Sequence, residues 1–368
     1  MGKHAEHVLS YRGSLIRAAQ ELGHEVHAIT GTAETAGARA RLAAASVELH
    51  EVPLDGGGAN PFKDTGTLRA IRAVVEEIRP DAAFCYNPKF MAFGPVAAKQ
   101  AGVPRIAAMV TGLGYAFTGG GFRRALVRLA LTRLYRRAFR CCDMVFFQNR
   151  DDLAEFTRHG VVQSSTRTTI VPGSGVDLSR FTPAPLPGGV HFLMISRLLR
   201  DKGVVEFAEA SQRVKATHPQ ATFTLLGGHD ANPTAIPREL IAQWRSRGVP
   251  AILAPTPEVR PALAACTIFV LPSYREGTSK VMLEAMATGR AVITTDAVGC
   301  REPIEPGVNG VLVPVADAEA LAAAMRTLAD DRALVEGMGR ESRRIAESRF
   351  ASRLVDDVIL AALGLGRA

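Results

Sequence analysis

The stretch FVLPSYREGTSKVMLEAMATGRAVITTDAVGCREPI, residues 269–304, decides the fold class of this chain. It opens with an apolar run that ends at Leu271, continues with the polar segment SYREGTS, and then places apolar residues at helical spacing. Another apolar run follows at residues 291–294. A buried strand, a loop, a helix and a second buried strand in this order are typical of parallel sheets covered by helices. The stretch therefore predicts an α/β fold.

The same alternation of short apolar runs and longer amphipathic stretches extends over the whole chain. Strands are expected at residues 25–29, 47–52, 82–86, 105–110, 144–148, 169–171, 190–196, 222–226, 251–253, 268–271, 291–294 and 310–313. The turn-rich segment FTPAPLPGG, residues 181–189, is interpreted as a linker.

This pattern predicts two doubly wound, Rossmann-like domains, residues 1–184 and 185–349. A last helix within residues 350–368 either completes the second domain or crosses back to the first. Two such domains joined by a hinge are expected to hold a ligand in a cleft, at the carboxyl ends of their strands.

Composition excludes several classes of protein. The 368 residues are 47% hydrophobic and 22% charged, which is incompatible with a disordered, collagenous or coiled-coil chain. No apolar run approaches the ~18–20 residues needed to span a bilayer, and the first residues lack the apolar segment of a secretory signal. The five cysteines form no CxxC or CxxH pair, so we expect reduced thiols in a cytoplasmic protein.

The net charge of +8 is concentrated in residues 119–140, GGGFRRALVRLALTRLYRRAFR, which hold seven arginines and no acidic residue. Arginines and leucines alternate there at spacings that predict a helix with an apolar and a cationic surface. Such a helix can lie on anionic lipid, or its arginines can form a solvated face over buried leucines. No nucleic-acid-binding motif accompanies the patch, so we expect no nucleic acid partner. The arginines considered are Arg124, Arg128, Arg133, Arg136, Arg137 and Arg140.

The first candidate site surrounds the predicted helix start near Ser279. The amides of Gly277, Thr278 and Ser279 would form an anion site there. Glu276 precedes this helix and Glu284 lies inside it, so both carboxylates can face one ligand and accept hydrogen bonds from sugar diols. The alternative is that Glu276 is an ordinary acid at a helix start and Glu284 a surface residue.

The second candidate site lies in VHFLMISRLLRDKGVVEFAEA, residues 190–210. Arg197 directly follows a predicted strand and Lys202 opens the next helix, so two cations can hold a pyrophosphate and stabilise it as it leaves. Both could equally be solvent-exposed loop charges. Gly227 and Gly228, in LLGGHD, end another strand of the same domain, although glycine pairs after strands occur in many turns.

Taken together, SRLLRDKG, LLGG and LPSYREGTSKVMLEAMATGRAVITT resemble the retaining GT-B glycosyltransferases of family 4, a resemblance that covers nearly the whole chain. Glu276 and Glu284 match the two acids of the E-x7-E motif of that family. The resemblance implies that Arg197 and Lys202 bind the diphosphate of a nucleotide-sugar donor and that Glu284 binds the ribose hydroxyls. It further implies that Glu276 and the 277–279 amides bind the transferred sugar, with Gly227 and Gly228 also at the donor.

Members of this family retain the anomeric configuration by front-face attack, in which the leaving phosphate accepts the proton of the acceptor. The chain contains no D-x-D triplet, which fits stabilisation of the leaving group by Arg and Lys. We therefore expect no catalytic metal and no cofactor.

The first half is similar to a narrower group, through CYNPKFMAFGPVAAKQAGVPRIAAMVTGLGYAF, the arginine-rich segment and FFQNRDDLAEF. These are bacterial enzymes that extend lipid-linked sugars, including those that add N-acetylgalactosamine to an undecaprenyl-diphosphate-linked amino sugar. The resemblance implies a UDP-N-acetylhexosamine donor and a polyprenyl-diphosphate-linked acceptor. It favours the lipid interpretation of the arginine-rich helix, at the inner face of the bacterial cell membrane. Thr111, Gly112 and Gly114 would line the acceptor or donor side, or form a tight turn.

One departure from the family concerns the first residues. Family members open with an apolar strand and a glycine-rich turn, whereas here only MGKHAEHVL precedes SYRGSLIRAAQELGHEVHAI. We therefore expect the first domain to lack a central strand. Two further functions stay open: a catalytically inactive GT-B chain that binds nucleotide or a partner enzyme, and a transferase with a soluble acceptor.

Overall fold

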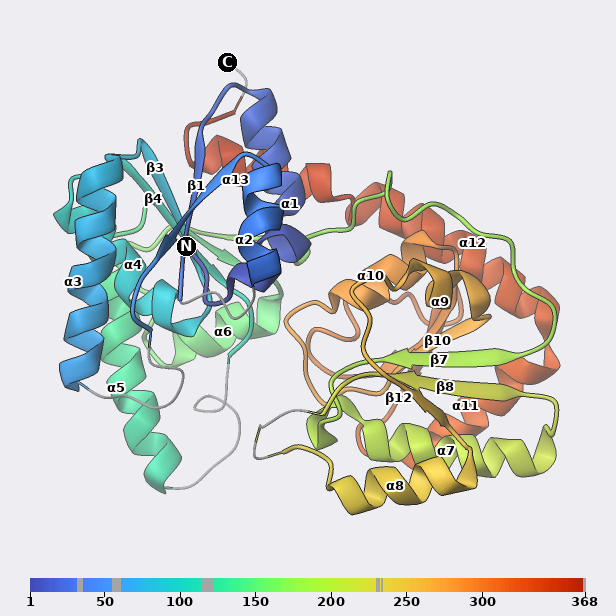
Figure 1. Ribbon diagram of the computed structural model, residues 1–368. Coiled ribbons are helices and arrows are strands. Elements are labelled where there is room, and N and C mark those ends of the chain that lie inside the picture. The colour runs from blue at the N-terminus through green and yellow to red at the C-terminus, as the bar shows by residue number, and fades with distance from the viewer. Residues whose placement is uncertain (32–35, 55–60, 114–121, 230–231, 233, 367–368) are drawn as a thin grey trace. The chain divides into compact units, whose positions relative to one another are not determined.

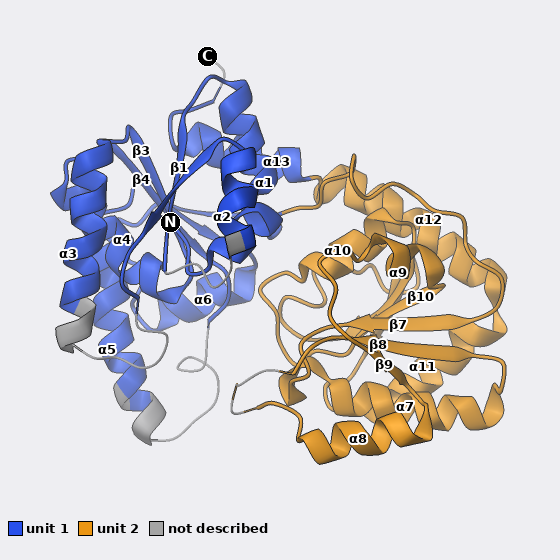
Figure 2. Cartoon of the chain, viewed as in Figure 1, with its two compact units in different colours: residues 1–174, 352–368 blue, residues 175–351 orange. Residues whose placement is uncertain are grey.

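The computed structural model describes residues 1–31, 36–54, 61–113, 122–229, 232 and 234–366. The chain divides into two compact units, residues 1–174 with 352–368, and residues 175–351 (Figure 2). The change of unit therefore comes earlier than the predicted boundary after residue 184. The physical reason is that Val176 belongs to the second unit, where its amide donates to the carbonyl oxygen of Phe350 at 2.7 Å and its side chain is buried.

The second unit is built on one parallel sheet with the strand order β12-β11-β10-β7-β8-β9. Helices α7, α8 and α11 pack on one face, while α9, α10 and the end of α12 pack on the other (Figure 1). The strands are β7 (His191–Ile195), β8 (Thr222–Leu226), β9 (Ala251–Leu253), β10 (Ile268–Leu271), β11 (Ala291–Thr295) and β12 (Gly310–Val313). The helices are η2 (Arg200–Lys202), α7 (Val204–Thr217), α8 (Arg238–Arg247), α9 (Arg260–Ala265), α10 (Lys280–Ala287), α11 (Ala318–Asp330) and α12 (Arg332–Arg349).

The first unit contains a four-stranded parallel sheet, β3-β4-β5-β6, and a two-stranded parallel sheet, β1-β2. Helices α3, α4, α5 and α6 share one core cluster, and α1 and α13 share another on the opposite face of the larger sheet. The strands are β1 (Val26–Thr30), β2 (Val47–Glu51), β3 (Ala82–Tyr86), β4 (Arg105–Val110), β5 (Met144–Phe147) and β6 (Thr168–Ile170). The helices are α1 (Ala5–Glu21), α2 (Ala36–Ala44), α3 (Pro61–Ile78), α4 (Pro88–Gln100), α5 (Phe122–Phe139), α6 (Arg150–Arg158) and α13 (Ser352–Ala362).

Residues 1–3 connect the two sheets of this unit. The Gly2 amide donates to the Ile29 carbonyl oxygen at 3.0 Å, on β1, and the Tyr86 amide donates to the Met1 carbonyl oxygen at 3.1 Å, on β3. The Met1 ammonium also donates to the Phe84 carbonyl oxygen at 2.7 Å. Among the described residues, β1 and β3 pair with no other strand on the sides that face each other. A pocket lined mainly by apolar side chains of β1, β3, α1 and the segment after α13 lies there.

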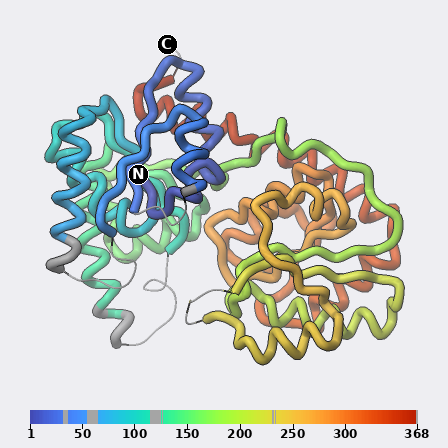
Figure 3. The backbone as a smooth tube through the Cα atoms, viewed as in Figure 1, coloured from blue at the N-terminus to red at the C-terminus, as the bar shows by residue number. Residues whose placement is uncertain are grey.

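Helix α13 returns to the first unit, which was one of the two alternatives for the end of the chain. It packs along α1, where Leu15 and Ala19 of α1 share a cluster with Val355 and Ile359 of α13. Figure 3 shows this last segment beside the beginning of the chain.

Asp356 of α13 makes the stability of this unit depend on pH. The residue is 4% exposed, and burial raises its pKa from 3.8 to about 7, against the opposing effects of a hydrogen bond with Ser14 and the charge of Arg12. Between these two pKa values the folded chain keeps a proton that the unfolded chain releases. The free energy of unfolding therefore falls as the pH rises from about 4 to 7, by at most roughly 4 kcal/mol, and levels off above pH 7.

We expect Asp356→Asn to remove this pH dependence. Thermal melts at pH 5 and pH 8 should give the variant a higher midpoint than the parent at pH 8, with a smaller difference at pH 5. Asp357→Asn, at the exposed neighbour on the same helix, should keep most of the pH dependence, because the charge of Asp357 raises the pKa of Asp356 less than burial does. Parallel pH profiles for the parent and Asp356→Asn would contradict the prediction.

Candidate functional site

The candidate site of the second unit lies where the path of the chain changes direction within its sheet. From β7 the chain continues to β8 and β9 on one side, and it then returns to β10 on the other side of β7. The chain therefore leaves the adjacent strands β7 and β10 in opposite directions along the sheet. Ligands of open α/β sheets bind at such a point, outside the carboxyl ends of the strands. The loops that follow these two strands, residues 196–203 and 272–279, contain most of the predicted donor-binding residues.

Lys202 and Glu276 meet across these two loops. The Lys202 Nζ atom lies 2.6 Å from Oε1 of Glu276, and the side chains are only 19% and 14% exposed. The backbone of Glu276 is also fixed, because its amide donates to the Val298 carbonyl oxygen at 2.9 Å. The structure thus brings together two of the three residues that the sequence predicts as catalytic.

Glycines allow the neighbouring loops to approach this ion pair closely. Gly203, directly after Lys202, has a φ of 73°, and a Cβ atom there would collide with the carbonyl oxygen of Pro272. A Cβ atom on Gly227 would likewise collide with the carbonyl oxygen of Ser196. The Leu198 amide donates to the Gly228 carbonyl oxygen at 3.0 Å, which joins the loop after β8 to the loop after β7. Gly227 is therefore required for this packing, whereas Gly228 takes part in it through its carbonyl oxygen.

The helix that follows the β10 loop begins as the sequence predicts. Ser279 is the N-cap of α10, and its hydroxyl accepts a hydrogen bond from the Met282 amide at 3.4 Å. Gly277 and Thr278 are half-buried just before it, and the Thr278 hydroxyl donates to the Gly277 carbonyl oxygen at 3.0 Å. The amino end of α10 thus lies in the same loop as Glu276, in a position to bind an anion.

Glu284 is buried on α10 and is not a surface residue. It is 6% exposed, and one of its oxygens lies 2.9 Å from the Nζ atom of Lys280. Burial raises the pKa of Glu284, while the charges of Lys280 and Arg180 oppose this effect. Lys280 is not among the residues predicted from the sequence. Its position four residues before Glu284 on the same helix was the available signal.

The remaining predicted residues are distributed over both units. Arg197 follows β7 and is exposed. In the first unit, Thr111 and Gly112 follow β4 and are half-buried, and Gly112 has a φ of 140°. Gly114 lies outside the described residues.

On α5, Arg133 and Arg137 are exposed and Arg128 is half-buried. Arg136 donates from Nε to the Gly160 carbonyl oxygen at 2.7 Å, so it helps to fix the helix to the chain after α6. Arg124 belongs to α5, but its side chain is outside the described part of the structure.

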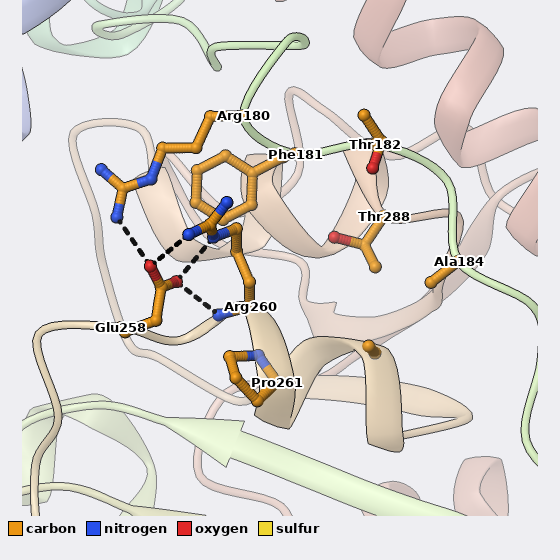
Figure 4. Close-up of a pocket in the computed structure, with 9 residues that line it drawn as sticks. Arg180, Phe181, Thr182, Ala184, Glu258, Arg260, Pro261 and Thr288 are labelled. Carbon is orange, nitrogen blue, oxygen red and sulfur yellow. Dashed lines mark hydrogen bonds and ion pairs between the residues drawn. The ribbon is translucent and has the colours of Figure 1, made fainter.

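Another pocket of about 320 Å³ in the second unit contains an ion-pair cluster, and the charges of two of its residues, Arg180 and Glu258, also act on Glu284 (Figure 4). Glu258 accepts hydrogen bonds from the Arg260 guanidinium at 2.8 and 2.6 Å and lies 3.4 Å from Arg180. The hydrogen bond from the Arg260 side chain is the main cause that lowers the pKa of Glu258 to about 2. None of the nine residues that line this pocket is a predicted donor-binding residue. We therefore do not assign the donor to it.

Comparisons with known proteins define the class and the family. Residues 8–173 match the family described as glycosyl transferase 4-like domain, and residues 189–331 match glycosyl transferases group 1. The chain has the GT-B fold: it is similar to the Anabaena HepE crystal structure, with a TM-score of 0.76 and 16% identity over 99% of this chain and 98% of that one. It is also similar to sucrose-phosphate synthase from Thermosynechococcus elongatus, with a TM-score of 0.77 and 19% identity over 96% and 92% of the two chains.

Among curated proteins, the chain is 30% identical over 289 residues to a Campylobacter jejuni enzyme, N,N'-diacetylbacillosaminyl-diphospho-undecaprenol alpha-1,3-N-acetylgalactosaminyltransferase. This match covers 75% of this chain and 74% of that enzyme. The chain is 25% identical over 297 residues to the Escherichia coli UDP-Gal:alpha-D-GlcNAc-diphosphoundecaprenol alpha-1,3-galactosyltransferase, covering 74% and 72%. The chain belongs to the group 1 glycosyltransferases, and the predicted α/β fold and enzyme class are confirmed.

Proposed function

We propose that this glycosyltransferase moves an N-acetylhexosamine from a UDP-sugar to a polyprenyl-diphosphate-linked saccharide, with retention of anomeric configuration. The observation that carries the proposal is the Lys202–Glu276 pair at the point where β7 and β10 diverge. The similarity to two transferases whose names specify undecaprenyl-diphosphate-linked sugars supports the acceptor class.

The residues of the second unit are suited to each part of the donor. The Lys202 ammonium has three donors, so it can keep its bond to Glu276 while it also donates to the diphosphate. With Arg197 it neutralises the negative charge that grows on the leaving phosphate as the sugar–phosphate bond breaks. The buried carboxylate of Glu284 accepts both ribose hydroxyls, and Glu276 accepts hydroxyls of the transferred sugar.

The proton and electron pairs balance without a nucleophile from the protein. The acceptor hydroxyl oxygen forms the new bond to the anomeric carbon, the bond to the leaving phosphate breaks on the same face, and a phosphate oxygen takes the acceptor proton. We also propose that transfer needs no bound metal, because the sequence contains no D-x-D triplet and provides two cations for the leaving group. Activity should therefore persist in excess EDTA.

A direct assay tests the function. The protein is incubated with UDP-N-acetylgalactosamine or UDP-N-acetylglucosamine and a polyprenyl-diphosphate-linked saccharide, and the product is analysed by mass spectrometry and by NMR of its anomeric proton. We expect a product one N-acetylhexosamine larger, with the donor's α configuration. An active chain that uses only soluble acceptors would contradict the acceptor proposal, and a correctly folded chain without turnover would support the inactive alternative.

We further propose that α5 contacts an anionic membrane surface. We predicted one apolar and one cationic surface, but the separation is incomplete. Val127 and Leu129 are 45% and 48% exposed at the amino-terminal part of the helix, whereas Tyr135 and Phe139 are buried in the core. The exposed apolar side chains lie on the same helix as the exposed Arg133 and Arg137, a combination that suits the lipid interface. No helix among the described residues is long and apolar enough to cross a membrane.

The variant Arg128→Glu/Arg133→Glu/Arg137→Glu tests this contact by sedimentation with phosphatidylglycerol vesicles. Each basic residue near an anionic surface contributes about 1 kcal/mol, so loss of three predicts at least roughly 100-fold weaker binding. The matched control reverses Arg238, Arg245 and Arg247, three exposed arginines of α8. Unchanged vesicle binding by the α5 variant would rule out the membrane contact.

A further inference from the structure

Strands β1 and β2 present the same tripeptide pattern, Glu-x-His, side by side. Glu25 directly precedes β1 and His27 lies in it, while Glu48 and His50 lie in β2. The parallel register pairs His27 with Glu48 and Ile29 with His50. Residues two apart on a strand, and residues opposite each other on neighbouring strands, point to the same face. The register therefore gathers two imidazoles and two carboxylates on one face of this sheet.

The distances among three of these groups match those of metal ligands. His27 Nδ1 lies 3.0 Å from His50 Nε2 and 3.4 Å from Glu48 Oε2, and His50 Nε2 lies 3.7 Å from Glu48 Oε1. Zinc binds histidine nitrogen and carboxylate oxygen at about 2.0–2.2 Å, which sets tetrahedral ligands roughly 3.3–3.5 Å apart. One ligand atom from each of the three side chains lies within 4.8 Å of the other two, so a small adjustment of the exposed Glu48 carboxylate would complete one face of a zinc tetrahedron.

A histidine that binds a metal through one ring nitrogen usually donates a hydrogen bond from the other to a carboxylate or carbonyl oxygen, and Glu25 is placed to accept it. Its Oε1 atom lies 3.3 Å from His27 Nε2, the ring nitrogen on the side away from His50. A proton held on Nε2 by Glu25 leaves the lone pair of Nδ1 directed at the other two ligands. The side chains of His27 and His50 are 20% and 17% exposed, so packing holds them, whereas Glu48 is 61% exposed and gives access from solvent.

We propose that His27, His50 and Glu48 bind a zinc-like transition metal ion, with water in the fourth position. Two imidazoles with one carboxylate suit zinc, cobalt or nickel, and not magnesium or calcium, which prefer sites made of oxygen alone. The metal would link β1 to β2 and stabilise the first unit. The ligands belong to the first unit and Lys202 and Glu276 to the second, so the site is distinct from the residues proposed for sugar transfer.

Titration of the metal-free, untagged protein with Co²⁺ tests the proposal, because tetrahedral Co²⁺ has an intense visible absorption that octahedral Co²⁺ lacks. We expect one equivalent to produce this absorption, Zn²⁺ to displace it, and one equivalent of Zn²⁺ to raise the melting midpoint. His27→Gln and His50→Gln should each abolish the absorption. Glu25→Gln should weaken binding by about 10- to 100-fold while keeping the spectrum.

Two controls keep the test decisive. His218→Gln removes a histidine that contacts a single carboxylate, Asp330, and should leave Co²⁺ binding unchanged. The metal-free melting midpoint of each variant shows that it folds. If the parent gives no tetrahedral spectrum, or the double variant His27→Gln/His50→Gln gives the same one, the cluster is a hydrogen-bonded pair of rings with carboxylate neighbours and the proposal is wrong.

Discussion

Replacement of Lys202 by Met is expected to lower kcat for sugar transfer by about 10²- to 10³-fold, the usual effect of removing one group that stabilises developing negative charge. The substitution keeps the length of the side chain but removes its ammonium. It also leaves Glu276 without the cation that lies 2.6 Å from it. Because that charge develops as the sugar–phosphate bond breaks, the loss should appear mainly in kcat and less in the KM for the donor.

Steady-state transfer rates of purified Lys202→Met, with a thermal melt to show that it folds, measure this effect. Lys99→Met is the control, since Lys99 is an exposed lysine of α4 in the other unit. A Lys202→Met enzyme with a kcat within threefold of the parent would show that Lys202 is only a structural partner of Glu276.

The second large effect is expected for Glu284→Gln, in donor binding. A buried carboxylate can accept hydrogen bonds from both ribose hydroxyls, whereas an amide offers only one acceptor atom. Loss of one charge-assisted bond costs about 2–3 kcal/mol, so the KM for the donor should rise by roughly 30- to 150-fold.

The pH dependence of that KM provides an independent check. Burial raises the pKa of Glu284, so its carboxyl group loses its proton at a higher pH than an ordinary glutamate does. While the proton is bound, one oxygen cannot accept a hydrogen bond from the ribose. The KM of the parent for the donor should therefore fall as the pH rises through this pKa, and the KM of Glu284→Gln should not follow. Glu239→Gln, at an exposed glutamate of α8, is the control. Equal pH profiles for the parent and Glu284→Gln would exclude this role.

Much of the architecture was predictable, because it depends on local patterns. Every predicted strand overlaps an observed one, and six have the observed bounds: residues 82–86, 105–110, 222–226, 251–253, 268–271 and 310–313. A chain in which short apolar runs alternate with amphipathic stretches is compatible with few folds other than a parallel sheet covered by helices. The start of α10 at Ser279 was predictable for the same reason, since capping depends on neighbouring residues.

Contacts between distant segments could not be predicted in this way. The pairing of residues 1–3 with both β1 and β3 depends on how two sheets of one unit approach each other. The bond from Arg136 to Gly160 requires the position of the chain after α6. The His27 and His50 cluster depends on the register of two strands, which neither tripeptide specifies alone. The position of α13 likewise depends on the apolar face of α1, against which it packs.

The central claim is that Lys202 and its neighbours in the second unit bind the diphosphate of a UDP-sugar. Isothermal titration of the parent and of Lys202→Met with UDP and with UMP tests it most directly, because the two ligands differ only in the second phosphate. We predict that the parent binds UDP at least tenfold more tightly than UMP and that Lys202→Met loses most of this difference. Equal affinities of the parent for UDP and UMP, or an unchanged preference in Lys202→Met, would contradict the claim.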